Sequence, residues 1–460
     1  MRKGLAIPLI FALLLVIQIS PQIQAQDSIV INKGNLNVPL DRFTSDGSHS
    51  RWYQPPTIPD TSGWQSITVS GCDTTDNPGF NDGTCIQNAL NQIDDDNGHI
   101  VYFPAGTYNI NVSQGFKITN SRVVLRGESP SNTILKWYDR DGGTSCPDAE
   151  FGASYMYFGF CGSLSGSTLT WQNGFDTDND IITLSDISTL AIGDWIRLRM
   201  DGAVNCLNGK TDNFMYTHTA RVSCRNGASP CDDDNHLSAN QIQLDRPLRM
   251  DYNDDPDCSS ANKYARELSM LDYVGIEDLA WTHNNRAIGK GFTGYPLFMF
   301  VNNGWVDNTR WFSLPNEGVR LWFTRDMLII NSDGSINTPE TTSVQTVNLG
   351  RGNTDSFVLN NRFGHSPTVV EAQQGTNGAV IAYNYFYNTD WCTHATFIHG
   401  RYSRGVLSEG NVAPCEFGMD ATHGINGPYN TFYRNRMTDA ASGARDHAGE
   451  CFGATSNGLI

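Results

Sequence analysis

Five segments in the second half of the chain share a pattern in which asparagine follows a hydrophobic or β-branched residue by four positions. Successive asparagines are separated by 30, 23, 27 and 24 residues, and they are Asn331, Asn361, Asn384, Asn411 and Asn435. A repeat of this length restricts a chain to folds in which one supersecondary unit stacks on the next. The units are rich in Val, Ile, Phe, Tyr and Thr and are broken by Gly, Asn and Pro, which indicates short strands joined by turns.

One coil of a parallel β-helix accounts for a unit of this size. Equivalent residues of successive coils then lie about 4.8 Å apart, the spacing of paired strands. Asparagine side chains stacked at that spacing can hydrogen-bond to one another and to the turn backbone, which satisfies their buried polar groups. We therefore predict an all-β fold, a single-stranded right-handed parallel β-helix, with the five asparagines in one column at a corner of the coils.

The N-terminal half carries an independent signal in "CIQNALNQIDDDNGHIVYFPAGTYNI" and "ITNSRVVLRGESPSNTIL". A short helix over about residues 85–93 is expected to cap the open end of the first coil. Ile86, Gln87 and Ala89, followed by residues 103–108 and 125–135, resemble the pectate-lyase-like superfamily of right-handed β-helix proteins. The resemblance implies the fold. It leaves the function open, because the superfamily includes polysaccharide lyases, glycoside hydrolases and phage tail-spike proteins.

The first residues predict export. Arg2 and Lys3 precede an apolar run, and a small-residue site follows, with cleavage expected after Ala25. We interpret residues 1–25 as a signal peptide of a secreted, periplasmic or cell-surface protein, with no later run long enough to span a membrane. Residues 26–65 are expected to form an extended lead-in and residues 66–460 the β-helix. Irregular insertions at about 139–180 and 201–263 are expected to be disulfide-tied loops or a small excursion from the coil.

The 11 cysteines favour disulfides, because in an exported chain close spacing of this kind is typical of cross-links. The expected pairs are Cys72 with Cys85, Cys146 with Cys161, and Cys392 with Cys415. Four cysteines between Cys206 and Cys258 allow three pairings among themselves. Cys451 is left over, either as a free thiol or because the natural chain continues past residue 460.

The charge restricts the partners. The chain has 31 basic and 48 acidic residues and a formal net charge of −17, which argues against nucleic acid or an anionic membrane as a partner. A polysaccharide is the expected partner, and an acidic one would need a locally basic groove or bound cations. Ca²⁺ held by oxygen ligands is the usual ion of exported carbohydrate proteins, but the sequence contains no motif that assigns metal ligands.

Two histidines suggest the catalytic site. His399 and His423 each precede a ladder asparagine by 12 residues, which predicts equivalent positions on adjacent coils. Arg401 and Arg404 follow the first histidine, and Glu371 is about one residue from the equivalent place on the preceding coil. Histidine is a natural base near neutral pH, and arginine binds carboxylates. We predict His399, His423, Arg401 and Arg404 as catalytic residues, the alternative being that these histidines only occupy turns.

These residues could cleave a uronic-acid glycan by β-elimination. That reaction needs a base and a positive group that stabilises the resulting anion. Glu371, Trp391 and Tyr402 are the predicted substrate-binding residues. The stretch also loosely resembles the alginate lyase and chondroitinase branch of the superfamily, which has Arg-His-Gly and a following Gly-Asn. His399, Gly400, Gly410 and Asn411 match, whereas Ile398 replaces the arginine and Gln373 or Gln374 stands near the expected lysine.

Two other functions remain open at the level of sequence. A glycoside hydrolase of the same fold would need two positioned carboxylates, for which Asp390 and Asp420 are candidates. A non-catalytic glycan-binding adhesin or tail-spike-like β-helix would need neither of them.

Overall fold

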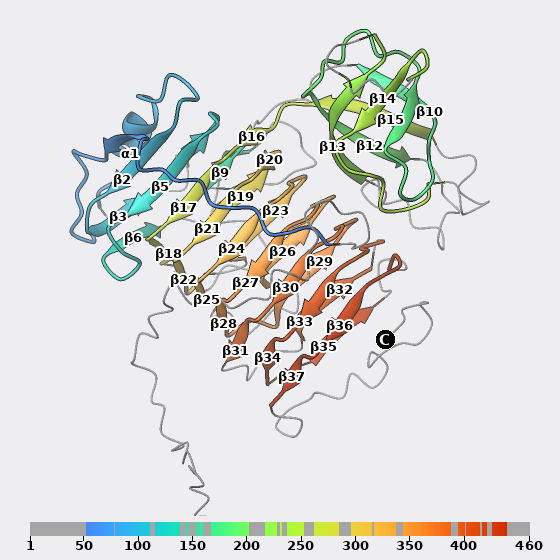
Figure 1. The fold of residues 1–460 in the computed structure, drawn as a ribbon. Coiled ribbons are helices and arrows are strands. Elements are labelled where there is room, and N and C mark those ends of the chain that lie inside the picture. The colour runs from blue at the N-terminus through green and yellow to red at the C-terminus, as the bar shows by residue number, and fades with distance from the viewer. Residues whose placement is uncertain are drawn as a thin grey trace, which may run out of the picture. The chain divides into compact units, whose positions relative to one another are not determined.

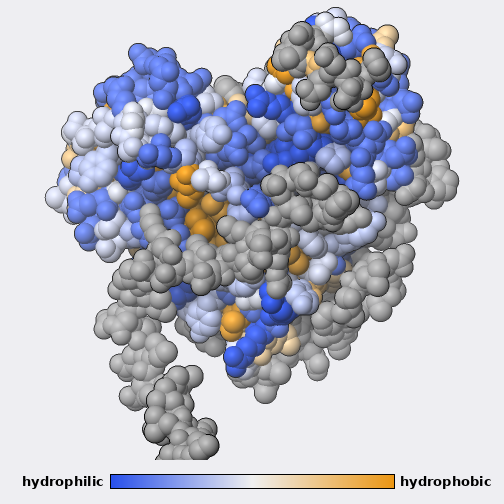
Figure 2. Space-filling model, in the orientation of Figure 1, coloured by the Kyte–Doolittle hydropathy of each residue, from blue (hydrophilic) through white to orange (hydrophobic). Residues whose placement is uncertain are grey.

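The structure is a computed structural model. It describes residues 52–438 except 78, 111–115, 139–143, 146–152, 155, 160–166, 202–216, 228–230, 232–236, 253–261, 285–295, 315–316, 337–343, 388–393, 401, 415 and 421–425. The expected signal peptide and most of the lead-in therefore lie outside the described residues. Within them, no helix is long and apolar enough to cross a membrane. Figure 2 shows that the face turned toward the viewer is mainly hydrophilic, with scattered apolar areas.

Three parallel sheets form the walls of the β-helix (Figure 1). Sheet A consists of β1 (Gln65–Thr68), β2 (His99–Phe103), β5 (Val123–Gly127), β17 (Gly275–Glu277), β21 (Trp305–Asp307), β24 (Leu328–Ile330), β27 (Phe357–Leu359), β30 (Val380–Ala382), β33 (Leu407–Glu409) and β36 (Thr431–Tyr433). Sheet B consists of β3 (Gly106–Ile110), β6 (Thr133–Trp137), β18 (Ala280–His283), β22 (Arg310–Phe312), β25 (Asp333–Ser335), β28 (Arg362–Gly364), β31 (Tyr385–Tyr387), β34 (Val412–Ala413) and β37 (Arg436–Met437). Sheet C consists of β4 (Phe116–Ile118), β9 (Met156–Phe158), β19 (Pro296–Met299), β23 (Val319–Trp322), β26 (Gln345–Gly350), β29 (Thr368–Gln373), β32 (His394–His399) and β35 (Glu416–Asp420).

A typical coil takes one strand from each of the three sheets. Strands β27, β28 and β29 form one coil, β30, β31 and β32 the next, and β33, β34 and β35 the one after. A short parallel pair, β16 (Leu271–Asp272) with β20 (Val301–Asn302), adds to the corner, and β7 (Thr144–Ser145) with β8 (Ala153–Ser154) forms a separate antiparallel pair. The predicted parallel β-helix is confirmed.

Four of the five predicted asparagines form the ladder. Asn361 Nδ2 donates to Asn384 Oδ1 at 3.1 Å, Asn384 Nδ2 to Asn411 Oδ1 at 3.0 Å, and Asn411 Nδ2 to Asn435 Oδ1 at 2.9 Å. Each of these Oδ1 atoms also accepts from the backbone N–H of the preceding ladder residue. The column therefore satisfies side-chain and backbone groups together.

The fifth prediction, Asn331, is wrong by one residue. Leu328 pairs with Phe357, so Ser332 lies opposite Asn361, and the Ser332 N–H donates to Asn361 Oδ1 at 3.0 Å. The sequence pattern counted from Met327, a buried turn residue, instead of from Leu328.

Asn331 belongs to a neighbouring column of left-handed turn residues. Its φ is 55°, its Nδ2 donates to Asp307 Oδ1, and its Oδ1 accepts from Asn360. Asparagine tolerates this backbone conformation, which most residues avoid. The left-handed turn position, held by Asn331, and the ladder position that follows it are therefore adjacent in sequence, and both favour asparagine.

The only helix in the described part of the chain, α1 (Gly83–Leu90), caps the first coil. Its side chains of Cys85, Ile86, Ala89 and Leu90 join the hydrophobic core of the β-helix. It begins two residues before the predicted range and ends three residues before the predicted end. The predicted disulfide between Cys72 and Cys85 is confirmed.

Aromatic side chains fill the coil interior. Trp281 stacks on Trp311 with ring centroids 5.0 Å apart, Trp311 contacts Phe363 at 5.5 Å, and Phe363 contacts Phe386 at 6.2 Å. All four are fully buried. Their large apolar area contributes to the core of the coils.

A closed antiparallel barrel stands where the sequence suggested insertions. Its strands, in barrel order, are β10 (Thr168–Asn173), β11 (Ile181–Leu184), β14 (Gln241–Leu244), β13 (Thr217–Arg225), β12 (Trp195–Asp201) and β15 (Asn262–Leu268). Parts of both expected insertions and the segment between them thus form one unit with its own hydrophobic core. The stack of coils continues past it, because Val124 of β5 pairs directly with Gly275 of β17.

One disulfide ties the barrel. Cys224 and Cys231 are bonded, which is one of the pairs that the sequence left open. The other expected pairs involve Cys146, Cys161, Cys392 and Cys415, which lie outside the described residues, as do Cys206, Cys258 and Cys451.

Candidate functional site

Sheet C carries a row of polar residues on its outer side. Alternation along the strands directs Val319, Val347 and Val370 into the coil interior and their sequence neighbours outward. The outward neighbours are Arg320, Asn348 and Glu371, which lie side by side on β23, β26 and β29. All three are buried. Buried polar groups are costly unless they are paired or serve a function, which marks this row as a candidate site.

His399 lies between two carboxylates at the end of this face. Its Nδ1 is 2.9 Å from Asp420 Oδ1, and its Nε2 is 4.0 Å from Glu371 Oε1. His399 is paired with Asp420 in the sheet, and the Phe397 ring lies 5.1 Å from the imidazole. The exposed fraction of the His399 side chain is 20%, against 4% for Glu371 and 8% for Asp420. The imidazole is therefore the member of this cluster that reaches the surface.

Glu371 is an acid with a shifted pKa. The pKa of Glu371 is raised to about 7, mainly by burial, with the charges of Glu317 and Asp420 acting in the same direction and His399 and Arg320 opposing the shift. Glu371 Oε2 has no hydrogen-bond partner. At neutral pH roughly half of the Glu371 carboxyl groups therefore carry a proton, which suits an acid–base site.

A second carboxylate on this face is neutralised. Arg320 binds Glu317 with both Nε and Nη2, and Asn348 Nδ2 donates to Glu317 Oε1 at 3.3 Å. The two-point contact fixes Arg320 in place. Glu317 and Arg320 therefore support the row rather than supply a free charge.

Arg351 is the partly exposed cation that follows β26. Its guanidinium lies 3.9 Å from the centroid of the Trp322 ring, and its Nε donates to Gln374 Oε1 at 3.2 Å. Gln374 follows β29, the strand of Glu371. The contact therefore directs the Arg351 side chain toward the coil that carries Glu371. The sequence analysis did not identify Arg351 as a functional residue.

The shifted pKa of Glu371 predicts a pH-dependent stability. The carboxyl group binds its proton more tightly in the folded chain than at its ordinary pKa of 4.5. Its contribution to stability is therefore complete below pH 4.5 and is lost as the pH rises through about 7. Relative to Glu371→Gln, the wild type is expected to lose about 3 kcal/mol of unfolding free energy between pH 4 and pH 8. Urea unfolding of both proteins across this range measures the difference, and parallel pH curves would contradict the shifted pKa.

The structure brings together only part of the predicted site. His399 and Glu371 lie close together, although Glu371 is two residues, not one, from Gln373, which pairs with His399. The predicted equivalence of His399 and His423 is wrong, because the residue opposite His399 is Asp420. The strands pair in register from Thr396 with Phe417, so counting back from the asparagines across turns of different length misplaced the histidine. His423, Arg401, Trp391 and Asp390 lie outside the described residues.

Arg404 and Tyr402 are directed toward the barrel. Arg404 is 1% exposed, and its Nη2 donates to the backbone oxygen of Thr217 on β13 at 3.2 Å. Tyr402 packs against the hydrophobic core of the barrel. A catalytic role was predicted for Arg404 and a substrate-binding role for Tyr402. Both side chains instead contact the barrel.

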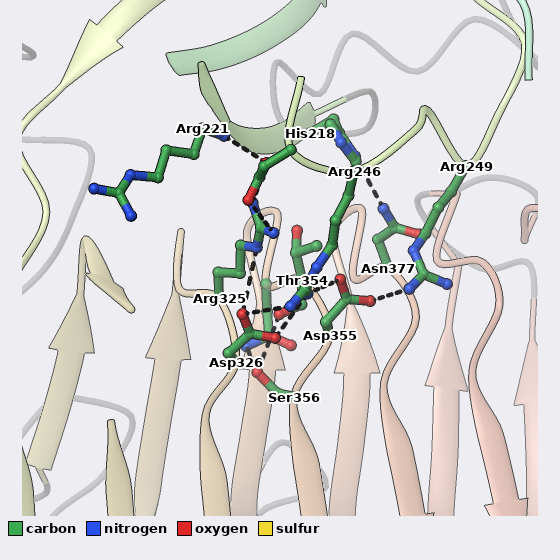
Figure 3. Close-up of polar contacts among 12 residues, drawn as sticks. His218, Arg221, Arg246, Arg249, Arg325, Asp326, Thr354, Asp355, Ser356 and Asn377 are labelled. Atoms are coloured by element: carbon green, nitrogen blue, oxygen red, sulfur yellow. Dashed lines mark hydrogen bonds and ion pairs between the residues drawn. The ribbon is translucent and has the colours of Figure 1, made fainter. Parts of the chain in front are cut away.

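A network of arginines and aspartates joins the barrel to the coil corners (Figure 3). The pairs are Arg246 with Asp326 and Asp355, Arg249 with Asp355, and Arg325 with Asp245. Burial and the surrounding arginines hold the pKa of His218 well below its ordinary value. Since each of these aspartates is bound by arginine, we interpret the network as a structural junction.

The sequence assigned no metal ligands. Among the residues that the structure describes, Asp94, Asp95 and His99 are close enough together to share an ion. His99 Nε2 is 2.8 Å from Asp95 Oδ1, so an ion pair or hydrogen bond already accounts for two of them. Among the described residues, no group of possible metal ligands is found at His399.

Comparisons with known proteins support the fold. No family model matches the sequence, and no curated protein matches it. Among solved structures, the tailspike protein gp49 of Pseudomonas phage LKA1 has a TM-score of 0.52 and 15% identity, over 78% of this chain and 53% of its own. The tailspike gp61 of Pseudomonas phage phi297 has a TM-score of 0.53 and 10% identity, over 81% and 64%. This chain thus spans between half and two thirds of these proteins, and at such low identity the likeness shows a shared fold.

Proposed function

We propose that this protein is an exported polysaccharide-degrading enzyme that cleaves an acidic glycan by β-elimination. The observation that carries the proposal is the imidazole of His399, held by Asp420 on one side and facing Glu371 on the other, at the surface of sheet C. The resemblance of residues 85–135 to the pectate-lyase-like superfamily supports a carbohydrate substrate.

His399 is suited to act as the base. Ionised Asp420 accepts a hydrogen bond, so the proton of the neutral imidazole lies on Nδ1 and the lone pair on Nε2. Nε2 takes the proton from the sugar carbon beside the carboxylate. The electrons of that C–H bond form the carbon–carbon double bond as the glycosidic C–O bond breaks, and the proton now on Nε2 passes to the leaving oxygen, which becomes a hydroxyl group.

The surrounding charges suit an anionic substrate. Because its pKa is raised to about 7, Glu371 carries less negative charge beside the sugar carboxylate near neutral pH than an ordinary glutamate would. We assign Arg351 the binding of that carboxylate, because it is partly exposed and follows β26, the strand that pairs with the strand of Glu371. Arg401 remains a second candidate from the sequence.

Hydrolysis is the second candidate. The raised pKa of Glu371 suits a general acid, and Asp420 offers a second carboxylate. A glycosidase, however, places the sugar, and in inverting enzymes also a water, between its two carboxylates. Here the imidazole of His399 occupies that place. Elimination therefore fits the geometry better.

Incubation with a panel of uronic-acid polysaccharides, with and without Ca²⁺, tests the proposal. We expect new unsaturated chain ends that absorb in the ultraviolet. New reducing ends without that absorbance would indicate a hydrolase instead, and no new ends on any polymer would indicate a non-catalytic glycan-binding protein.

A further inference from the structure

The barrel has a cavity of about 490 Å³ on its outer surface. This volume lies within the range of small-molecule sites, about 300–1,000 Å³. Its lining comes from β10, the turn after it and β15, and consists of Thr168, Thr170, Trp171, Phe175, Asn262, Lys263 and Tyr264.

The cavity forms where two strands part. β10 pairs with β15 from Thr168 to Thr170 and with β11 from Trp171 to Asn173, with a bulge between Trp171 and Asn173. The two residues at the start of β15, Asn262 and Lys263, pair with β12 and have no partner on β10. The strands therefore diverge beside them, and a gap opens in the barrel wall.

The floor of the cavity is aromatic and its rim is polar. Trp171 is 2% exposed, and its ring lies 5.0 Å from the ring of Phe175. The hydroxyl-bearing Thr168 and Thr170 and the amide-bearing Asn262 are exposed at the rim. An apolar floor with a few polar groups around it is the general form of a sugar site.

One cation, Lys263, lines this cavity, and a second, Arg199, contacts the lining residue Tyr264. The Lys263 ammonium lies 4.7 Å from the centroid of the Phe175 ring, and the Arg199 guanidinium lies 5.7 Å from that of Tyr264. Burial lowers the pKa of Lys263, and the charge of Asp251 opposes that shift. Lys263 therefore supplies a positive charge in the lining of the cavity, on a chain whose formal net charge is −17.

We propose that this cavity is a second, non-catalytic glycan site that binds a carboxylated sugar unit through Lys263. The choice of an acidic sugar rests on the proposed function, whereas the site itself is separate from the His399 face. Holding the polymer at the barrel would raise its local concentration at the catalytic face.

Calorimetric titration of the inactive His399→Ala protein with tetragalacturonate and tetramannuronate tests this site, with cellotetraose as the neutral probe.

We expect the titration to show two binding sites for an acidic tetramer. Lys263→Met removes the charge, and Thr170→Phe fills the cavity without changing Lys263. Each substitution should lower the affinity of one of the two sites at least tenfold. Lys117→Met makes the same charge change on β4 of sheet C and serves as the matched control.

In the otherwise wild-type protein, Lys263→Met should leave kcat on tetramers unchanged and raise the polymer concentration needed for half-maximal rate. Unchanged binding in both Lys263→Met and Thr170→Phe would overturn the second site. If no polymer is cleaved but Lys263→Met still removes acidic-tetramer binding, the proposed catalysis fails and the barrel site stands.

Discussion

Replacing His399 by alanine is expected to lower the rate of glycan cleavage by about 10²–10⁴-fold, the usual contribution of a positioned acid–base group. The variant loses the only member of the cluster that is substantially exposed, and its neighbours cannot replace it, because Glu371 is buried and Asp420 is turned toward the imidazole. The thermal midpoint should change little, since His399 contributes no apolar area to the coil interior. Initial rates of ultraviolet absorbance at saturating substrate measure the effect.

A matched pair of asparagine variants separates chemistry from charge and size. His399→Asn should be as inactive as His399→Ala. His365→Asn, on the corner after β28 of sheet B, makes the same change away from the cluster and should retain full activity. If His399→Ala retains full activity on a polymer that the wild type cleaves, His399 is not the catalytic base and has only a structural role.

Replacing Asn384 by leucine is expected to cost about 3–5 kcal/mol of unfolding free energy, because several buried groups lose their partners at once. Asn384 Oδ1 accepts from the backbone and side chain of Asn361, and its Nδ2 donates to Val358 O and Asn411 Oδ1. Leucine has a similar size and offers none of these contacts. Denaturant unfolding followed by fluorescence measures the loss.

Asn435→Leu is the control for this effect. Asn435 occupies the last position of the ladder and is only partly buried, so its groups can exchange partners with water. We expect it to cost less than half as much as Asn384→Leu. Equal losses at the two positions would mean that burial in the ladder is not what stabilises the column.

The repeat could be predicted from sequence because its signal is local. The four residues from Asn361 to Asn435 follow strands whose hydrophobic residues recur at a fixed distance before them. The error at Asn331 has the same origin, since Met327 and Leu328 both fit the pattern and only the strand pairing distinguishes them.

The site was predictable only in part. Alternation in "GVRLWF" places Arg320 on the outer face, but nothing in that stretch shows that Glu371 and Asp420 converge on His399 from neighbouring coils. Turns of different length separate these strands, so the distance in sequence does not give the register. The barrel was missed for a related reason, because β12 pairs with β15 across more than 60 residues, over which no local pattern indicates a partner.

The contact between Val124 and Gly275 imposes an order on folding. Most neighbouring coils close loops of about 40 residues or fewer, as the 29 residues between Leu328 and Phe357 do, whereas this contact closes a loop of about 150 residues. Loop-closure entropy rises by about 0.6 kcal/mol for each doubling, which makes this junction costlier by roughly 1.5 kcal/mol if the intervening chain is unfolded. A barrel that folds first brings its two ends together and removes most of this difference. The C-terminal coils can then add to the N-terminal ones as if the insertion were a short turn.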